Sequence, residues 1–259
     1  MTIPKILAVI PARYQSQRFP GKPLVQIGQT TMVQRVYEAA KSCEAFSRVI
    51  VATESEQIAE CVRGFGGEVE LTADTHETGT DRIAEVAARH PDYQVVVNVQ
   101  GDQPFVRAHM LHQLVEPYLV GEGKDPAQDE WPEKWPEMTT LACPLDLEQD
   151  LDNPNVAKVL CDCAANALYF SRSPIPYFRK KLDAPVYHHL GLYAFRADFL
   201  ATYTQLEATP LEQCESLEQL RVIEHGYRIR VCQTETAIIE INTPDDLTVA
   251  QALIAQGKL

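Results

Sequence analysis

The 259-residue sequence predicts an α/β fold built on a doubly wound, mostly parallel sheet. Strand-like and helix-like patterns alternate through residues 5–99, as they do in chains made of strand–helix–strand units. Residues 93–99 are almost all apolar, which is typical of a strand buried on both faces of a parallel sheet. A basic loop follows the first expected strand, and the ligands of such sheets bind where strands end.

The expected elements of the first half follow one another in chain order. Strands are expected at residues 5–10, 48–53, 68–71 and 93–99, and helices at residues 31–42, 55–65 and 80–89. Ser55 is the expected N-cap of the second helix, and Gly66-Gly67 is the expected stop. This alternation favours crossover connections between parallel strands.

The second half carries shorter strand patterns and an interruption. Strands are expected at residues 139–143, 156–161, 167–170, 189–195 and 228–233, and helices at residues 211–224 and from Pro244, which Thr243 should cap. Residues 121–137 combine glycine, proline and acidic residues with Trp131 and Trp135. We expect them to form an exposed loop with an aromatic anchor.

Composition and charge exclude several classes of protein. The formal net charge is -13, which argues against nucleic acid as a partner, because binding to its backbone needs a broad basic surface. No stretch approaches the roughly 20 apolar residues of a membrane span, and the N-terminus does not read as a secretory signal. Seven dispersed cysteines indicate reduced thiols. We therefore expect a cytoplasmic enzyme or binding protein with no membrane partner.

The basic loop is the first candidate site. It contains Arg13, Arg18 and Lys22, and residues 1–37 hold five basic residues and no acidic one. Such a loop suits a small polyanion, for example a nucleoside triphosphate. It lacks the GxGxxG pattern of dinucleotide sites, and Pro23 after Gly21-Lys22 excludes a Walker A loop. A surface turn with scattered basic residues remains the alternative.

Two further motifs lie near the ends of expected elements. Thr78-Gly79-Thr80-Asp81-Arg82 begins a helix, where backbone N–H groups can meet an anion or a base edge. Gln100-Gly101-Asp102 follows the buried strand, where a carboxylate is well placed for a divalent cation such as Mg²⁺. The alternatives are an ordinary capped helix start and an aspartate in a tight turn.

The basic loop resembles the R-x(4)-R-x-P-G-K-P-L signature of sugar nucleotidyltransferases. Over nearly the whole chain, and at five separate motifs, the sequence resembles the family of 3-deoxy-manno-octulosonate (Kdo) cytidylyltransferases. The resemblance implies a nucleotide-diphospho-sugar transferase-like fold with a smaller sugar-acid-binding and dimerisation portion. It also implies a single domain over residues 1–259, with a nucleotide-binding half at 1–120 and a sugar-acid-binding half at 138–259.

The implied reaction is Mg²⁺-dependent transfer of CMP from CTP to Kdo, for lipopolysaccharide biosynthesis, by a homodimer. In this resemblance Arg13, Lys22 and Asp102 are catalytic, and Asp102 holds the metal. The implied nucleotide-binding residues are Arg13, Arg18, Lys22, Thr78, Gly79, Arg82 and Gln100. The implied sugar-acid-binding residues are Arg172, His189, Tyr193, Glu218 and Gln219. Arg82 could equally be a structural ion-pair partner.

Two sequence segments refine this expectation. Spacing along the expected 211–224 helix puts Glu215, Glu218 and Gln219 on one face. Asn242 stands where the family pattern V-D-T-P-E-D-L has an aspartate that binds metal, so the metal should be held more weakly. If the segment is extended, Glu240 points to the same side and partly replaces the missing charge. Two alternatives remain, namely transfer onto 8-amino-3,8-dideoxy-manno-octulosonate and a catalytically silent CTP-binding relative.

Overall fold

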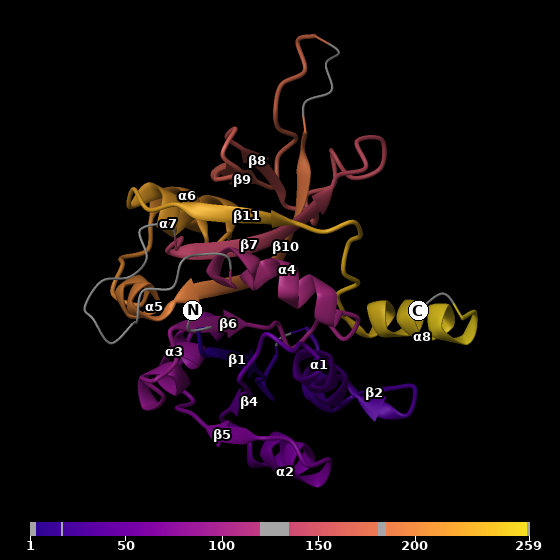
Figure 1. The fold of residues 1–259 in the computed structure, drawn as a ribbon. Helices are drawn as coiled ribbons and strands as arrows, with labels where there is room; N and C mark the ends of the chain where they lie inside the picture. The colour runs from indigo at the N-terminus through magenta and orange to yellow at the C-terminus, as the bar shows by residue number, and fades with distance from the viewer. Residues whose placement is uncertain (1–3, 17, 120–134, 181–184, 258–259) are drawn as a thin grey trace. The chain divides into compact units, whose positions relative to one another are not determined.

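The computed structural model describes residues 4–16, 18–119, 135–180 and 185–257. The chain forms two compact units (Figure 1). The N/C unit comprises Ile3–His112 and Ile238–Leu259, and the middle unit comprises Gln113–Ala237. The C-terminal segment thus belongs with the first part of the chain, and the division into halves at 1–120 and 138–259 stays a prediction.

Four parallel strands form the sheet of the N/C unit. They are β1 (Ile6–Pro11), β4 (Arg48–Thr53), β5 (Val69–Leu71) and β6 (Val95–Asn98). β1 pairs with β4 on one side and with β6 on the other, and β5 pairs with the far edge of β4. Ile6 to Ile10 have no exposed surface, which explains the continuous apolar run. All four strands lie at or within two residues of their expected positions.

Three helices connect these strands and make the sheet doubly wound. They are α1 (Met32–Lys41), α2 (Glu56–Gly64) and α3 (Gly79–Arg89). The chain moves outward from β1 through β4 to β5 and then returns to β6 on the other side of β1. Right-handed crossovers therefore place α1 and α2 on one face and α3 on the other, and Figure 1 shows α1 and α3 on opposite sides of β1. The expected fold class is confirmed.

The remaining elements of the N/C unit surround the basic loop. A short 3₁₀ helix, η1 (Lys22–Leu24), leads into the hairpin of β2 (Gln26–Ile27) and β3 (Thr30–Thr31), which the sequence analysis missed. The last helix, α8 (Pro244–Ala255), begins at the expected cap, Thr243. It packs on a small apolar cluster of Ile27, Met32 and Ile241. The helix α4 (Ala108–Leu119) follows the β6 segment, begins in the N/C unit, ends in the middle unit, and carries exposed His109 and His112.

The middle unit is built mainly on antiparallel pairs. Its elements are β7 (Met138–Pro144), β8 (Lys158–Cys161), β9 (Ala167–Ser171), β10 (Tyr187–Arg196), α5 (Ala197–Tyr203), α6 (Pro210–Glu215), α7 (Leu220–Glu224) and β11 (Ile229–Gln233). β10 pairs antiparallel with β7 and β8, and β8 pairs antiparallel with β9. β11 pairs parallel with β7. A register shift interrupts the pairing of β10 with β7 between His189 and Tyr193.

The single helix expected over residues 211–224 is wrong. The chain forms α6 and α7, separated by Ser216, whose φ of 52° lies in the left-handed region. At the start of α6, Oε2 of Glu212 accepts the Thr209 N–H at 3.1 Å, and the Glu212 carbonyl oxygen accepts the Ser216 N–H. Glu215 therefore lies on α6, whereas Glu218 lies in the turn and Gln219 is the residue just before α7, so the three do not share one helix face.

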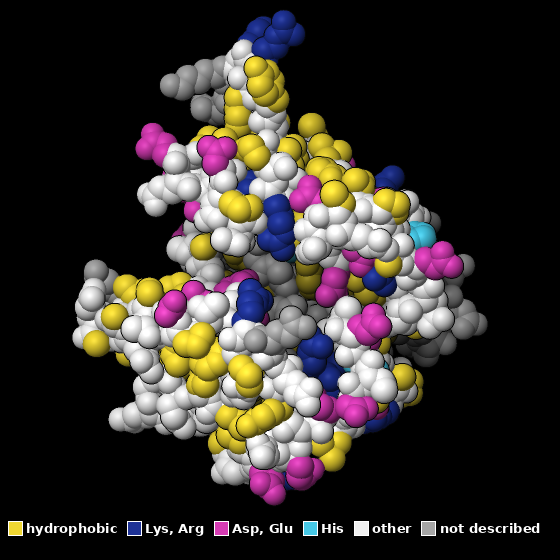
Figure 2. Space-filling view, turned by 180° about the vertical axis from the view of Figure 1, so that it is seen from behind, with side chains coloured by type: hydrophobic (Ala, Val, Ile, Leu, Met, Phe, Trp, Pro, Cys, Tyr) yellow, Lys and Arg dark blue, Asp and Glu magenta, His cyan; other side chains and the backbone are white. Residues whose placement is uncertain are grey.

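Two surface segments complete the description. Residues 120–134, which include Trp131 and most of the expected exposed loop, lie outside the described residues. Trp135 is buried and makes an edge contact with Tyr118 at a ring-centroid distance of 5.7 Å. Residues 172–180 begin an arm of the middle unit, which Figure 2 shows as apolar side chains ending in basic ones. Within the described part of the chain, no helix has the length and apolar character needed to cross a bilayer.

Candidate functional site

Three sequence motifs meet at the end of β1, on Pro11. A Cβ atom added to Gly79 would lie 3.2 Å from Cγ of Pro11, and one added to Gly101 would lie 2.7 Å from its carbonyl oxygen. Both glycines are therefore required by close approach of the chain rather than by turn geometry. The basic loop, the start of α3 and the segment after β6 meet at the topological switch point between β1 and β6, where ligands of doubly wound sheets bind.

The basic loop, residues 12–22, is held at Tyr14. The Tyr14 N–H donates to Oε1 of Glu54 at 2.9 Å, and its carbonyl oxygen accepts from the Gly21 N–H at 2.8 Å. Gly21 has a φ of 70°, a conformation that favours glycine, and it precedes the first residue of η1, Lys22. The loop therefore folds back on itself, and its cations lie at the end of the sheet where β1 ends.

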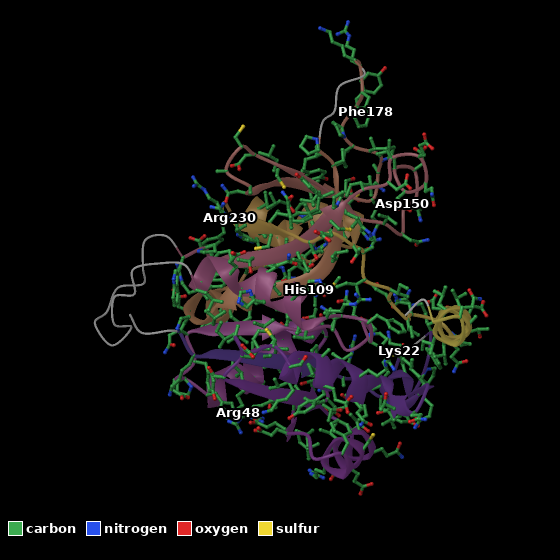
Figure 3. The ribbon with its side chains drawn as sticks, turned by 45° about the vertical axis from the view of Figure 1, so that its right-hand side comes forward. Lys22, Arg48, His109, Asp150, Phe178 and Arg230 are labelled. Atoms are coloured by element: carbon green, nitrogen blue, oxygen red, sulfur yellow. The ribbon has the colours of Figure 1, made fainter. Side chains whose placement is uncertain are left out.

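Each cation of the loop contacts a different segment of the N/C unit. Lys22 Nζ lies 2.9 Å from Oδ2 of Asp102, and the two side chains are 15% and 27% exposed. Arg18 donates to Oδ1 of Asn242 at 3.3 Å. Arg13 donates to the carbonyl oxygen of Glu77 at 3.1 Å. Figure 3 labels Lys22 beside α8.

The helix start after this loop is a complete capping box. Thr78 Oγ1 accepts from the Asp81 N–H at 3.1 Å, and Oδ2 of Asp81 accepts from the Thr78 N–H at 3.2 Å. Gly79 is the first residue of α3, so its backbone N–H lies at the positive end of the helix dipole. Gln100 is partly exposed, and its carbonyl oxygen accepts from the Gln103 N–H at 3.2 Å.

Arg82 lies beneath the loop rather than on its surface. The residue has no exposed surface, and its guanidinium donates to the Thr72 hydroxyl and the Ala73 carbonyl. A second guanidinium nitrogen lies 3.1 Å from Oε2 of Glu54. Burial is the main cause that lowers the pKa of Arg82, and the nearby charge of Arg13 lowers it further. The structure thus places Arg82 in the ion pair that the sequence left as its alternative role.

Glu240 and Asn242 contact each other and the segment of Asp102. Asn242 Nδ2 donates to Oε2 of Glu240 at 3.1 Å, and Gln103 Nε2 donates to Oε1 of Glu240 at 3.0 Å. The Ile241 N–H donates to the Asp102 carbonyl at 2.9 Å. Although Glu240 as a residue is exposed, partial desolvation of its carboxylate and the charge of Asp102 raise its pKa. The two side chains lie on the same side of the segment, as the sequence analysis expected.

The carboxylates of Asp102 and Glu240 fit a metal ion that takes its remaining ligands from phosphate oxygens. Among the described residues, no group of three or more His, Cys, Asp and Glu side chains is arranged to hold a metal ion. Mg²⁺ commonly takes one or two carboxylates and completes its shell with phosphate oxygens and water. Asp102 and Glu240 supply that number, whereas the amide oxygen of Asn242 already accepts from Arg18.

The middle unit holds a buried neutral network. Thr140 donates to the Leu192 carbonyl at 2.8 Å, so its hydroxyl oxygen accepts from Nε2 of His189 at 2.9 Å. The other ring nitrogen of His189 then accepts from Gln219 at 3.4 Å, and Gln219 Oε1 accepts from the Tyr193 hydroxyl at 3.1 Å. Burial lowers the pKa of His189 to about 3. The imidazole is therefore neutral at physiological pH.

This network brings together three of the five residues expected to bind a sugar acid. His189, Tyr193 and Gln219 are 7%, 8% and 2% exposed. Glu218 is half-buried in the turn before α7. Thr140 fixes the tautomer of His189, and the sequence analysis missed it because a threonine inside a strand carries no motif.

Arg172 is engaged by the backbone of its own unit. Its guanidinium donates to the carbonyl oxygens of Pro154, Glu215 and Ser216 at 3.0, 2.9 and 3.4 Å. The Glu215 carboxylate accepts from the Ser171 hydroxyl at 2.6 Å and from the Arg172 N–H at 2.9 Å. Arg172 and Glu215 thus hold the break between α6 and α7, and Glu215 was not expected to have this role.

The match to known families covers most of the chain. A family model described as "Cytidylyltransferase" matches residues 7–229. A 3-deoxy-manno-octulosonate cytidylyltransferase from Acaryochloris marina is 64% identical over 252 residues, covering 97% of this chain and 98% of the relative. The protein of the same name from Synechococcus elongatus is 53% identical over 253 residues, covering 97% and 99%.

Solved structures agree with these matches. A CMP:2-keto-3-deoxy-manno-octonic acid synthetase complexed with CTP superposes with a TM-score of 0.87 and 37% identity, covering 98% of this chain and 99% of the other. A 4-diphosphocytidyl-2C-methyl-D-erythritol synthase from Anaerococcus prevotii superposes with a TM-score of 0.61 at 13% identity, covering 98% and 100%. The second likeness supports the fold alone.

Proposed function

The chain belongs to the family of 3-deoxy-manno-octulosonate cytidylyltransferases, and we propose that it transfers CMP from CTP to Kdo and releases pyrophosphate. It is an enzyme of the nucleotidyltransferase class. The observation that carries the proposal is the Lys22–Asp102 pair at the switch point of the sheet, flanked by Arg13 and Arg18. The alternative acceptor is 8-amino-3,8-dideoxy-manno-octulosonate.

In this reaction the anomeric hydroxyl oxygen of the sugar acid forms a bond to the α-phosphorus of CTP. The bond from the α-phosphorus to the bridging oxygen of the β-phosphate breaks, pyrophosphate leaves, and the hydroxyl proton passes to solvent. Nothing in this route requires a covalent enzyme intermediate, so catalysis is positioning and charge neutralisation. Arg13 and Lys22 neutralise the triphosphate, and Arg18 supports them.

The nucleotide and the sugar acid call for different side chains. Thr78, Gly79 and Gln100 are the proposed contacts to the nucleoside, because they lie at the start of α3 and after β6. His189, Tyr193, Glu218 and Gln219 are the proposed contacts to the sugar acid, since hydroxyl groups are recognised by neutral donors and acceptors. Arg172 is proposed to hold the segment that presents them rather than to meet the sugar carboxylate itself.

Mg²⁺ is the proposed cofactor, held by Asp102 and Glu240 together with phosphate oxygens. Bound there, it neutralises phosphate charge and lowers the pKa of the attacking hydroxyl. Lys22 pairs with Asp102 when no nucleotide is bound and turns to the phosphates when CTP arrives. The side-chain amide of Asn242 keeps both neighbours in place, because its oxygen accepts from Arg18 and its nitrogen donates to Glu240.

The test is pyrophosphate release from CTP, with Kdo and its 8-amino analogue as parallel acceptors, across a Mg²⁺ titration. We expect turnover with Kdo that depends on Mg²⁺. Turnover with the 8-amino sugar alone would change the substrate and keep the mechanism. CTP binding without pyrophosphate release from either acceptor would identify a catalytically silent relative.

A separate measurement addresses the metal ligands. Binding of Mn²⁺ in the presence of CTP, followed by electron paramagnetic resonance, should weaken about 10-fold in Glu240→Gln. Glu235→Gln is the control, because Glu235 is an exposed residue of the middle unit. Unchanged Mn²⁺ affinity in Glu240→Gln would remove Glu240 from the metal site.

We also propose that the enzyme is a cytoplasmic homodimer. The sequence resemblance described above implies both properties, and seven unpaired cysteines fit a reducing compartment. Light scattering on the purified protein should give twice the chain mass of 29.0 kDa. A mass of one chain at working concentration would contradict the dimer.

A further inference from the structure

Glu54 links a buried cation to the backbone of the basic loop. Its Oε1 accepts the Tyr14 N–H at 2.9 Å, and its Oε2 lies 3.1 Å from the guanidinium of Arg82. The Glu54 side chain is 17% exposed and that of Arg82 is 1% exposed. The charge of Arg13 is close enough to affect the pKa of Arg82. One carboxylate therefore serves a buried cation and the backbone of the loop.

The backbone is fixed both before and after Glu54. Glu54 follows directly after β4, whose last residue, Thr53, has no exposed surface. The Ser55 N–H donates to the Thr53 hydroxyl at 3.1 Å, and Ser55 caps α2 through the Ile58 N–H. Glu54 thus projects from a fixed junction of strand and helix, which is where a positioning residue is most effective.

The anchor at Tyr14 reaches both ends of the basic loop. Arg13 is its neighbour in sequence, and the Tyr14 carbonyl accepts the N–H of Gly21, the residue before Lys22. No other described side chain accepts a hydrogen bond from the Tyr14 N–H, so the loop depends on Glu54 at this point. One carboxylate oxygen thus anchors the backbone next to Arg13 and, through Tyr14, the turn that leads to Lys22.

We propose that Glu54 is a positioning residue that preorganises the basic loop for the triphosphate of CTP. The proposal rests on the proposed function, because it takes CTP as the ligand of the loop. A loop that is only fractionally in its binding-competent form binds with an affinity reduced by that fraction. Saturating CTP restores the competent form, so loss of the anchor raises the Kd and KM for CTP and leaves kcat nearly unchanged.

A matched pair of double variants isolates the Tyr14 anchor. Glu54→Gln/Arg82→Met keeps an oxygen acceptor for the Tyr14 N–H, whereas Glu54→Met/Arg82→Met removes it, and neither leaves a buried unpaired guanidinium. We expect the Met variant to bind CTP about 10- to 50-fold more weakly than the Gln variant, with kcat at saturating CTP within about twofold. Equal affinity of the two folded variants would overturn the proposal.

Three further measurements separate the possible failures. Glu56→Met is the single-site control, because Glu56 pairs with Arg63 on the exposed face of α2 and should leave the KM for CTP unchanged. In the unmodified protein, the Tyr14 amide should be protected from hydrogen exchange, and free exchange would also overturn the proposal. If the unmodified protein itself binds no CTP, the proposed function fails rather than the role of Glu54.

Discussion

The two groups of side chains proposed to bind substrates differ in charge and in burial. In the N/C unit, Lys22 and Asp102 form a partly exposed ion pair, and the charges of both act on the nearby carboxylate of Glu240. In the middle unit, His189 and Gln219 are neutral, buried and connected by hydrogen bonds. The first arrangement suits a ligand that brings its own charge and metal. The second suits hydroxyl groups, whose recognition needs oriented donors and acceptors.

The difference predicts where single changes act. A charged, partly exposed group can be removed without unfolding the protein, so its loss appears in turnover. A buried neutral group is part of the packing, so its loss appears in the free energy of unfolding. Variants of the two groups should therefore separate activity from stability.

Lys22→Met should give the largest effect. Removing one group that neutralises developing charge should lower kcat by about 10²- to 10³-fold, and the midpoint of thermal unfolding should change little. Lys41→Met is the control, since Lys41 is exposed at the end of α1. The measurements are pyrophosphate release and circular dichroism. Near-normal turnover in the Lys22 variant would remove Lys22 from the catalytic group.

Gly101→Ala should lower both turnover and stability. The added methyl group would lie 2.7 Å from the Pro11 carbonyl oxygen, so β1 and the Asp102 segment must move apart. Overpacking of this kind costs about 1–3 kcal/mol, and the shift should reduce turnover at least about 10-fold.

The control for Gly101→Ala is Gly64→Ala at the end of α2. A methyl group there meets nothing within 4 Å, so turnover should be unchanged and stability should change by less than about 1 kcal/mol. Chemical denaturation and pyrophosphate release measure both variants. Equal effects of the two substitutions would show that the approach to Pro11 is not critical.

The sequence predicted the N/C unit more fully than the middle unit. The motifs at Gly79 and Gly101 could be found because they match a known sequence pattern, although the close approach of each glycine is to Pro11, 68 and 90 residues away in the sequence. The break at Ser216 matches no such pattern. It depends on carbonyl oxygens of Glu215 and Ser216 that meet Arg172, 43 and 44 residues away. The spacing of residues within 211–224 cannot reveal a contact with Arg172. For this reason the prediction of a single helix was wrong.

The same reasoning explains which site residues were missed. Glu54 follows directly after β4, at the same end of the sheet as the basic loop. An acidic residue at this strand end could therefore have been predicted to contact the loop. Thr140 and Glu215 offered none, because each acts on partners far away in sequence. Arg82 was recognised as a motif residue, but only the tertiary structure shows that its charge is buried.

His189 should make stability depend on pH. Its pKa is about 3 in the folded protein and about 6.5 when unfolded, so the unfolded state binds more protons as the pH falls below about 6.5. This group alone should reduce the free energy of unfolding by about 2 kcal/mol between pH 7 and pH 5. The loss should be absent in His189→Gln.

The control for that measurement is His109→Gln, because His109 is exposed on α4. Urea denaturation of the three proteins at pH 7 and pH 5 gives the comparison. If the His189 variant and the unmodified protein lose equal stability, the imidazole is not held neutral by burial, and the contrast between charged and neutral sites weakens.

Thr243→Ala should have the smallest effect, because it removes a cap at the solvent-exposed start of α8. Thr243 Oγ1 accepts the Asp246 N–H at 3.2 Å, and Asp246 in turn accepts the N–H groups of Asn242 and Thr243. Loss of such a cap costs about 1 kcal/mol of stability. Thr248→Ala, one turn into the same helix, should change it by less than about 0.5 kcal/mol. Because the Asp246 carboxylate still holds Asn242, turnover should stay within about twofold. A larger fall would mean that the cap itself positions the proposed metal-binding segment.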